Sequence, residues 1–134
     1  MALIRELALF ELEPDAVITS EEVLIRDGFG PAPHFHCLLA VSEGQVIGMS
    51  FCYIRYSTWK GKRLYLEDLI VTEAWRGRGV GSLLFDDTLA LARVLGCNAV
   101  CWQVLDWNTP AIEFYKAKGG WVKNGWLDMQ LELE

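Results

Sequence analysis

LYLEDLIVTEAWRGRGVGSLLFDDTLALA, residues 64–92, decides the fold of this chain of 134 residues. Its first part, Leu64 to Val71, is an apolar run with two carboxylates at its centre, and this pattern predicts a β-strand. A short polar connection and a glycine-rich turn follow, and a helical pattern begins at Val80. The order is therefore strand, glycine turn, helix.

The glycine turn has the composition of an anion-binding loop. Glycines permit a tight backbone that leaves several N–H groups exposed at the start of a helix, where the helix dipole favours a phosphate. The alternative is a tight corner that packs the helix against a sheet, and the neighbouring chemistry has to decide between them. The candidate residues are Arg76, Gly77, Arg78, Gly79, Val80, Gly81 and Ser82.

Composition limits the classes of function. A chain that is 52% hydrophobic with six Trp predicts a folded single domain, residues 1–134. The net charge of −6 disfavours a nucleic-acid binder, which needs a basic footprint, and would attract a cationic small molecule instead. No apolar run reaches the roughly 20 residues of a membrane span, and the N-terminus lacks a signal-peptide layout. We therefore expect a cytoplasmic protein without a membrane or nucleic-acid partner.

The cysteines and histidines do not form a metal-ligand pattern. Cys37, Cys52, Cys97 and Cys101 each lie beside apolar residues, and no two of them form a CxxC pair. We interpret them as small buried hydrophobic residues. His34 and His36 stand before an apolar run without a second ligand cluster, so a structural role is favoured and no metal is expected.

The remaining chain predicts a mixed α/β domain. Helices are expected over 3–12, from Thr19 or Ser20 to the glycines at 28 and 30, over 80–95, and over 111–118 with Thr109 as cap. Strands are expected over 35–41, 46–56, 64–71 and 99–105, the first three as an antiparallel meander and the last parallel to 64–71. An Asn124–Gly125 turn followed by alternation predicts a final strand over 126–133. The apolar stripe expected on the helix over 80–95 consists of Leu83, Leu84, Leu91, Val94 and Leu95, with Phe85 off it.

Glu67 and Asp68 interrupt a strand that otherwise has the pattern of core. Because side chains alternate along a strand, the two carboxylates would point to opposite faces, unless a bulge brings them to one site. A carboxylate among apolar neighbours needs a partner. That partner is either a substrate cation or, in a purely structural role, Lys62 or Arg63.

These features together resemble a known family. Residues 76–81 fit the R-x-x-G-x-G pattern of the GCN5-related N-acetyltransferases (GNAT), with Glu67-Asp68 upstream and WNTPAIEFY, residues 107–115, downstream. The combination is similar to the spermidine/spermine (diamine) and thialysine acetyltransferases, over nearly the whole chain. The resemblance implies a GNAT-like mixed sheet flanked by helices, and transfer of an acetyl group from acetyl-CoA to a primary amine.

The resemblance also implies roles for particular residues. Tyr115 would be the general acid and Glu67 would accept the ammonium proton. A homodimer is expected. The cofactor would be held by the backbone of Leu69, Ile70 and Val71, by residues 76–82, and by Asn108 and Lys118. The acceptor amine would be bound by Phe10, Glu11, Trp59, Glu67 and Asp68.

The chain departs from the family pattern at several positions. It lacks the family's first strand and the start of the first helix, which implies either a truncated sequence or an edge covered by another protomer. Ser57 stands where polyamine-acetylating relatives tend to have Asp, which favours a smaller amine. Two alternatives stay open: an acetyl-CoA-binding module without catalysis, and an enzyme that acetylates protein lysines or N-termini.

Overall fold

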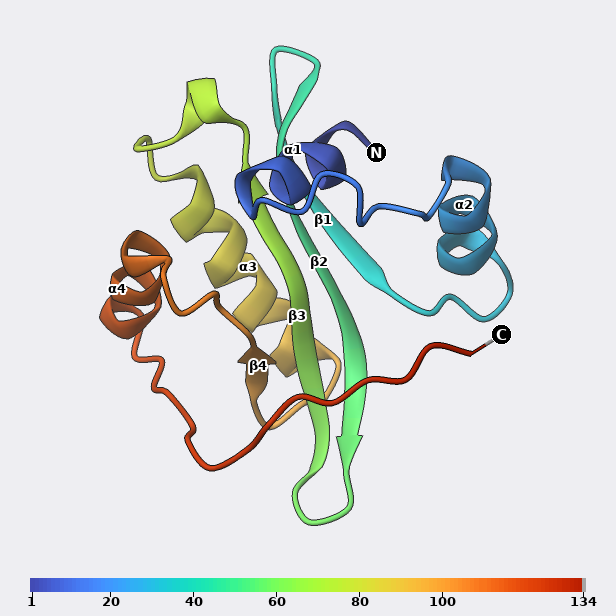
Figure 1. The fold of residues 1–134 in the computed structure, drawn as a ribbon, viewed down its shortest axis with the longest axis vertical. Coiled ribbons are helices and arrows are strands. Elements are labelled where there is room, and N and C mark those ends of the chain that lie inside the picture. The colour runs from blue at the N-terminus through green and yellow to red at the C-terminus, as the bar shows by residue number, and fades with distance from the viewer. Residues whose placement is uncertain (134) are drawn as a thin grey trace. The chain divides into compact units, whose positions relative to one another are not determined.

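The chain forms two compact units, residues 1–103 and 104–134, and a four-stranded mixed sheet is the centre of the first. The computed structural model describes residues 1–133. The strands are β1 (His36–Ser42), β2 (Gln45–Ser57), β3 (Gly61–Val71) and β4 (Val100–Trp102), in the spatial order β1-β2-β3-β4 (Figure 1). The first three are antiparallel and β4 runs parallel to β3, which confirms the predicted meander and crossover.

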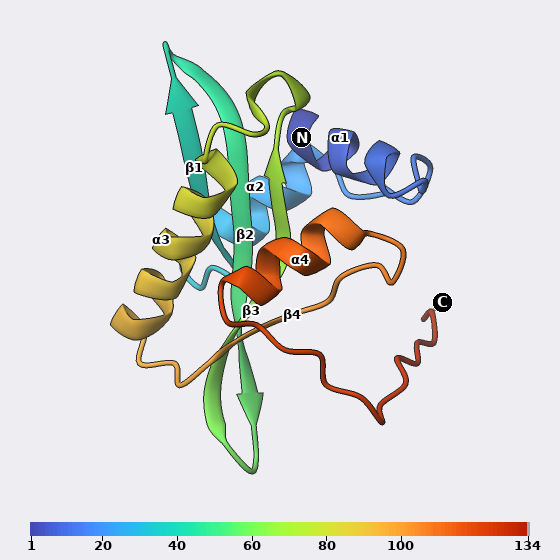
Figure 2. The same cartoon turned by 90° about the vertical axis from the view of Figure 1, so that its left-hand side faces the viewer.

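Helices cover both faces of this sheet. They are α1 (Ala2–Phe10), α2 (Glu21–Phe29) and α3 (Val80–Val94), and a 3-10 turn, η1 (Glu73–Trp75), precedes α3. The predicted cap of α2 is confirmed, because the Ser20 hydroxyl accepts a hydrogen bond from the Val23 N–H at 3.3 Å. Figure 2 shows α3 and α1 on opposite sides of the sheet, with α2 overlapping the strands in this view. The predicted class of fold, a mixed sheet flanked by helices, is therefore confirmed.

The buried face of α3 differs from the predicted stripe. Phe85 is 2% exposed, whereas Leu83 and Val94 are 62% and 83% exposed, so the predicted stripe was wrong at these positions. The helix is oriented by two contacts with β2. Gly48 leaves room for the side chain of Leu84, and the Thr88 hydroxyl lies 2.6 Å from that of Ser50. The face in the core is made by Leu84, Phe85, Thr88 and Ala92.

A β-bulge interrupts β3 at its two carboxylates. Cys52 pairs with Leu66, but the preceding residue of β2, Phe51, pairs with Asp68. Glu67 is therefore the extra residue on β3. A bulge of this kind breaks strict alternation and turns the extra side chain toward the face of its neighbour. The opposite-face expectation fails, and the bulge alternative is correct.

The ends of two strands differ from the predicted ranges. β3 begins at Gly61 instead of Leu64, because its pairing with β2 continues down to the Ser57–Gly61 pair at the hairpin. β4 contains only Val100–Trp102 of the expected 99–105, and these residues pair with Leu64 to Leu66. β3 is longer than predicted because its pairing with β2 continues to the hairpin, and β4 is shorter than predicted because its pairing with β3 stops at Leu66.

The second unit contains one helix, α4 (Thr109–Ala117). Its cap is Asn108, whose side-chain oxygen accepts from the Ala111 N–H at 3.3 Å, so the expected Thr109 cap was wrong. The expected strand over 126–133 is also absent from the structure, in which residues 126–133 carry no regular secondary structure. An isolated extended segment has no ladder partner, and alternation alone does not make a strand.

The burial of the cysteines differs from the prediction at one position. Cys37 is exposed, so the expectation of four buried cysteines was wrong there, whereas Cys52 is fully buried. Within residues 1–133, none of the helices combines the length and the apolar character that crossing a bilayer would require.

Candidate functional site

The loop between η1 and α3 is shaped by two glycines in the left-handed region. Gly77 has φ +71° and Gly79 has φ +83°, conformations that glycine adopts without the penalty paid by other residues. A Cβ added at either position would meet no atom within 4 Å, so the space beside this loop is open. Gly79 is the N-cap of α3 and has no side chain with which to satisfy the first turn.

A row of unused backbone donors lines this loop. The first bond of α3 runs from the Leu83 N–H to the Gly79 carbonyl at 3.1 Å, so the N–H groups of residues 80–82 precede the helical ladder. Within the described chain, residues 1–133, the N–H groups from Gly77 to Ser82 donate to no backbone carbonyl. At the positive end of a 15-residue helix, this row favours an anion such as phosphate.

The two arginines of the loop behave differently. The Arg78 guanidinium lies 4.9 Å from the centre of the Trp75 ring and is exposed beside the glycines. Arg76 instead contacts the chain itself, since its Nε donates to the Val71 carbonyl at 2.8 Å and its Nη2 lies 3.3 Å from Glu6 Oε1. Arg78 is thus placed to add charge to an anion site, whereas the charge of Arg76 is already paired.

The part of β3 beyond Leu66 has an open edge. Among residues 1–133, no strand pairs with it there on the side of β4. The Thr72 N–H donates to the Ile47 carbonyl at 2.8 Å. Ladder alternation then directs the backbone of Ile70 toward β2, and that of Leu69 and Val71 toward the open edge.

The three predicted backbone contacts on β3 are therefore not equivalent. Ile70 is 4% exposed and gives its side chain to the core and its N–H and C=O to β2. The Val71 carbonyl is taken by Arg76, so the groups at the open edge are those of Leu69 and the Val71 N–H. An extended, amide-bearing ligand arm would meet these groups as an added strand does.

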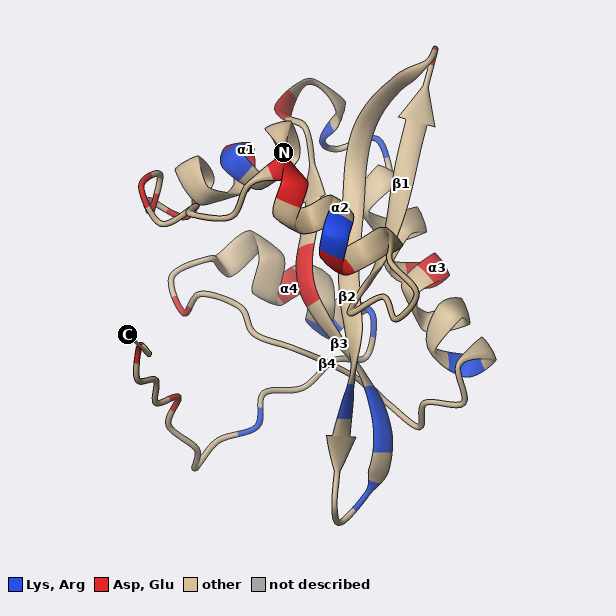
Figure 3. Cartoon of the chain, turned by 90° about the vertical axis from the view of Figure 1, so that its right-hand side faces the viewer, with Lys and Arg blue, Asp and Glu red and all other residues tan. Residues whose placement is uncertain are grey.

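Three carboxylates, those of Glu11, Glu67 and Asp68, form what we call the acidic cluster. Burial raises the pKa of Asp68 to about 6, and the charges of Glu67 and Glu11 contribute to the rise. Burial also raises the pKa of Glu11, which follows the last residue of α1. Figure 3 shows the red segment halfway along β3, distant from the blue residues at the β2–β3 hairpin. The charges of the predicted acidic acceptor residues thus act on one another, and among residues 1–133 none of the three forms an ion pair with Lys62 or Arg63.

Tyr53 is an addition to this cluster that the sequence did not indicate. Burial and the charge of Glu67 raise the pKa of the Tyr53 phenol, and Arg55 opposes this effect. Its ring centre lies 5.3 Å from that of Tyr65, its partner on β3. Tyr53 is one of several aromatic residues along β2, and the sequence does not distinguish it from the others. Its place beside the acidic cluster follows only from the pairing of β2 with β3.

Two predicted acceptor residues lie apart from each other. Phe10 precedes Glu11 in the sequence and is 41% exposed. The centre of its ring lies 5.3 Å from the Arg76 guanidinium. Trp59, 85% exposed, is in the turn between β2 and β3. From Gly61 at the end of that turn to Glu67 the strand rises about 20 Å, so the structure does not bring Trp59 to the acidic cluster.

The remaining predicted residues belong to α4 and its cap. Asn108 holds the first turn of α4. Tyr115 is half-buried, and its ring meets that of Phe114 edge-on, with centres 5.2 Å apart. Lys118 follows the last helical residue. Tyr115 lies in the last turn of α4, two residues before its end at Ala117.

The most informative residue that the sequence left unnoticed is Glu6. It shares a face of α1 with Phe10, four residues on, but its partners lie 66 to 70 residues away. A long-range contact of this kind leaves no periodic signal in the sequence.

The chain is similar to known proteins both in sequence and in fold. The model of the acetyltransferase (GNAT) family matches residues 2–120. The chain is 44% identical over 127 residues to a thialysine N-epsilon-acetyltransferase of Bos taurus, covering 89% of this chain and 75% of the relative. It is 41% identical to the thialysine N-epsilon-acetyltransferase of Mus musculus, covering all of this chain and 85% of the relative. A crystal structure of an aminoglycoside acetyltransferase from an uncultured soil metagenomic sample, 20% identical, superposes with a TM-score of 0.80 over 98% of this chain and 86% of that one.

Proposed function

Because the chain belongs to the acetyltransferase (GNAT) family, we propose that it moves an acetyl group from acetyl-CoA to a primary amine of a small cationic substrate. The predicted family resemblance is confirmed, and the protein is an N-acetyltransferase. The observation that carries the proposal is the juxtaposition, in one unit, of a free row of N–H donors and a cluster of three carboxylates. The row of N–H donors suits a phosphorylated cofactor, and the three carboxylates suit a cationic acceptor.

The residues present fit acetyl-CoA. The N–H groups of residues 77–82 and the exposed Arg78 would hold its pyrophosphate, and the open edge at Leu69 and Val71 would receive its amide-bearing arm. Asn108 and Lys118 are proposed as further cofactor contacts. When bound, acetyl-CoA supplies the acetyl group as a reactive thioester.

The protein's own part in the chemistry is the handling of two protons. An alkyl-ammonium has to lose a proton before its nitrogen becomes a nucleophile, and we propose that the Glu67 carboxylate accepts it, directly or through water. We propose that the phenol of Tyr115 donates a proton to the departing sulfur. The N–H groups at the open edge of β3 would polarise a carbonyl placed there.

The acidic cluster supports a cationic acceptor. Near neutral pH a carboxyl with a pKa of about 6 is mostly ionised, and a bound cation stabilises its charged form further. The charges of these three carboxylates repel one another, so an ammonium group between them relieves an unfavourable arrangement. We propose a diamine, a polyamine or a thialysine-like amino acid, and the relatives named for thialysine support the last of these.

An acceptor panel tests this proposal. The purified protein is assayed with acetyl-CoA and putrescine, spermidine, thialysine, lysine or a histone peptide. We expect transfer to a small amine, with thialysine and the short diamine ahead of spermidine. Transfer to none of the five would favour the alternative of a non-catalytic acetyl-CoA-binding module, and transfer to the peptide alone would favour protein acetylation.

A matched pair of variants tests the proposed acid. Tyr115→Phe removes the phenol proton but keeps the ring against Phe114, and general acid catalysis contributes about 10²- to 10⁴-fold. Phe114→Tyr adds a phenol at the neighbouring position and serves as control. Full activity of Tyr115→Phe would exclude Tyr115 as the acid.

We also propose that the protein acts in the cytoplasm as a homodimer. The second unit supports association, because four apolar side chains of its tail, those of Leu127, Met129, Leu131 and Leu133, are 86% to 93% exposed. Apolar exposure on this scale is typical of an interaction surface. Sedimentation of the wild type and of a Leu127→Ser, Leu131→Ser variant tests it: we expect a dimer that the two serines weaken.

A further inference from the structure

Glu6, on the same helix as Phe10, is hydrogen-bonded to the segment that leads into the cofactor loop. We infer that Glu6 is a positioning residue for coenzyme binding: it fixes the start of the loop through Thr72, Glu73 and Arg76 without touching the coenzyme. This inference rests on the proposed function and adds to it a residue that the family pattern does not mark.

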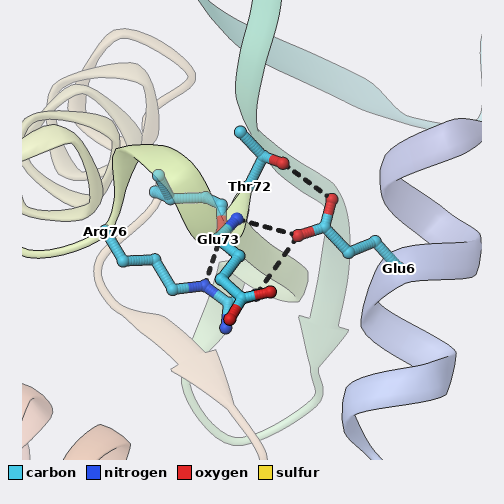
Figure 4. A network of polar contacts seen from close by, with 5 residues as sticks. Glu6, Thr72, Glu73 and Arg76 are labelled. Atoms are coloured by element: carbon cyan, nitrogen blue, oxygen red, sulfur yellow. Dashed lines mark hydrogen bonds and ion pairs between the residues drawn. The ribbon is translucent and has the colours of Figure 1, made fainter.

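The Glu6 carboxylate accepts three hydrogen bonds from this segment (Figure 4). Its Oε1 accepts from the Glu73 N–H at 3.0 Å and from Arg76 Nη2 at 3.3 Å, and its Oε2 accepts from the Thr72 hydroxyl at 2.9 Å. The donors are a side-chain hydroxyl, a backbone amide and a guanidinium, from three residues within five positions. One carboxylate thereby fixes both the end of β3 and the turn of η1.

Arg76 connects the same segment to two other elements. Its Nε donates to the Val71 carbonyl at 2.8 Å, and its guanidinium lies 5.3 Å from the centre of the Phe10 ring. The guanidinium therefore joins the last residue of β3 to two residues of α1, Glu6 and Phe10. We assign Arg76 to these contacts with Glu6, Val71 and Phe10, which we call the joint, and not to the neutralisation of phosphate. Arg78 is then the cation that lies beside the glycines of the loop.

The joint matters because the loop that follows it, which contains Gly77 and Gly79, has few side-chain contacts to fix its conformation. Gly77 and Gly79 have no side chains, and a Cβ at either would meet nothing within 4 Å. The direction of the N–H row is then set by its two ends, α3 on one side and the segment 72–76 on the other. Pre-organised donors bind an anion more tightly than donors that must be ordered first.

A role of Glu6 in folding stability alone predicts a different result for coenzyme affinity. The side chains of Glu6 and Arg76 are 31% and 40% exposed, and ion pairs so exposed contribute little to folding stability. If Glu6 only stabilised the fold, its loss would lower the melting temperature slightly and leave coenzyme affinity unchanged. If it positions the loop, coenzyme affinity falls and the Michaelis constant for the amine changes less.

Glu6→Gln, which keeps the size of the side chain and removes its charge, is the test variant. Glu13→Gln, an exposed carboxylate shortly after α1, is the matched control. CoA affinity is measured by calorimetry, and the Michaelis constants for acetyl-CoA and for the amine are measured separately. For Glu6→Gln we expect CoA affinity to fall about 5-fold, the scale of one charge-assisted hydrogen bond in a partly exposed site, with kcat nearly unchanged.

A second pair of variants avoids dependence on one substitution. Thr72→Val removes the hydroxyl that donates to Glu6 Oε2, and Thr72→Ser retains it. We expect Thr72→Val to weaken CoA binding and Thr72→Ser to restore it. Arg76→Gln should weaken binding by a similar factor, and adding Glu6→Gln to it should have little further effect, because both remove the same joint.

The possible outcomes separate the two proposals. If the wild type binds no CoA, the proposed function fails, and the inference fails with it. If the wild type binds CoA and both Glu6→Gln and Thr72→Val bind it equally well, only the inference is overturned. Hydrogen exchange of the free protein gives an independent reading: the Glu73 amide should exchange faster in Glu6→Gln than in Glu13→Gln, and equal exchange would count against the joint.

Discussion

Glu67 is the extra residue of the β3 bulge, and its charge adds to the effect of burial in raising the pKa of the neighbouring Asp68. In an unbroken strand two consecutive side chains would lie on opposite faces of the sheet. The bulge instead exposes Glu67 and leaves Asp68 mostly buried, so that one carboxylate is open to water and the other is near its titration range. This arrangement suits a pair in which one group exchanges protons and the other recognises a cation.

The raised pKa of Asp68 predicts a pH-dependent cost to stability. The folded carboxyl, with a pKa of about 6, holds its proton more tightly than the unfolded one at 3.8. Unfolding therefore releases protons between about pH 4 and pH 6, and the free energy of unfolding falls as pH rises across this window. Asp68→Asn should be the more stable protein by about 3 kcal/mol at pH 7.5, since one pKa unit corresponds to about 1.4 kcal/mol, and close to wild type at pH 4.

Urea unfolding at both pH values measures this difference, with Asp106→Asn, exposed in the second unit, as control. A variant that is equally stabilised at pH 4 and pH 7.5 would show that the effect comes from packing and not from titration.

The same carboxyl should shape the pH dependence of catalysis. Only ionised Asp68 attracts an ammonium group, so kcat/KM for the amine should rise through about pH 6 on its acidic limb. Glu11→Gln removes one of the charges that raise this pKa, and the limb should therefore move to lower pH. A limb that stays in place in both Glu11→Gln and Asp68→Asn would assign it to another group.

Much of the fold could be predicted because its signals are local. The α2 cap at Ser20, the glycine turn and the helix after it all follow from residue type and spacing. The face of α3 could not be predicted in the same way, since it depends on Gly48 and Ser50 of another element, more than thirty residues away. The end of β4 depends likewise on where pairing with β3 stops.

The same distinction between local and long-range signals decides which parts of the candidate site could be predicted. The loop that we propose as the anion site was visible as a motif, because a phosphate needs glycines and free amides in consecutive positions. The bulge was visible only as an alternative, and the register between Phe51 and Asp68 decided it. Glu6 was not visible at all, because its helix position is ordinary and its partners come from a distant segment. Motifs identify what contacts a ligand more readily than what holds those contacts in place.

A buried pair of hydroxyls offers a test of the packing between α3 and the sheet. Thr88 donates to the Leu84 carbonyl at 2.7 Å, so the Ser50 hydroxyl, 2.6 Å away, has to be the donor to Thr88. Thr88→Val leaves the Ser50 hydroxyl buried without an acceptor, at a cost of about 1–3 kcal/mol. Ser50→Ala should cost less, and the double variant should cost less than the two single variants added together. Additive losses would mean that the two hydroxyls do not interact.

The last prediction separates the strain of a left-handed glycine from the function of the cofactor loop. Gly79 at the start of α3 and Gly96 just after its end have φ +83° and +71°, and a methyl group added at either would meet no atom within 4 Å. Alanine at either site should therefore destabilise the fold by a similar amount, about 1–2 kcal/mol, through backbone strain alone. Gly79→Ala alone also reorients an N–H row placed for an anion, so it should raise the Michaelis constant for acetyl-CoA several-fold while Gly96→Ala leaves it unchanged. Thermal unfolding gives the first comparison and steady-state kinetics the second, and equal kinetic effects of the two variants would mean that the glycine turn serves the fold and not the cofactor.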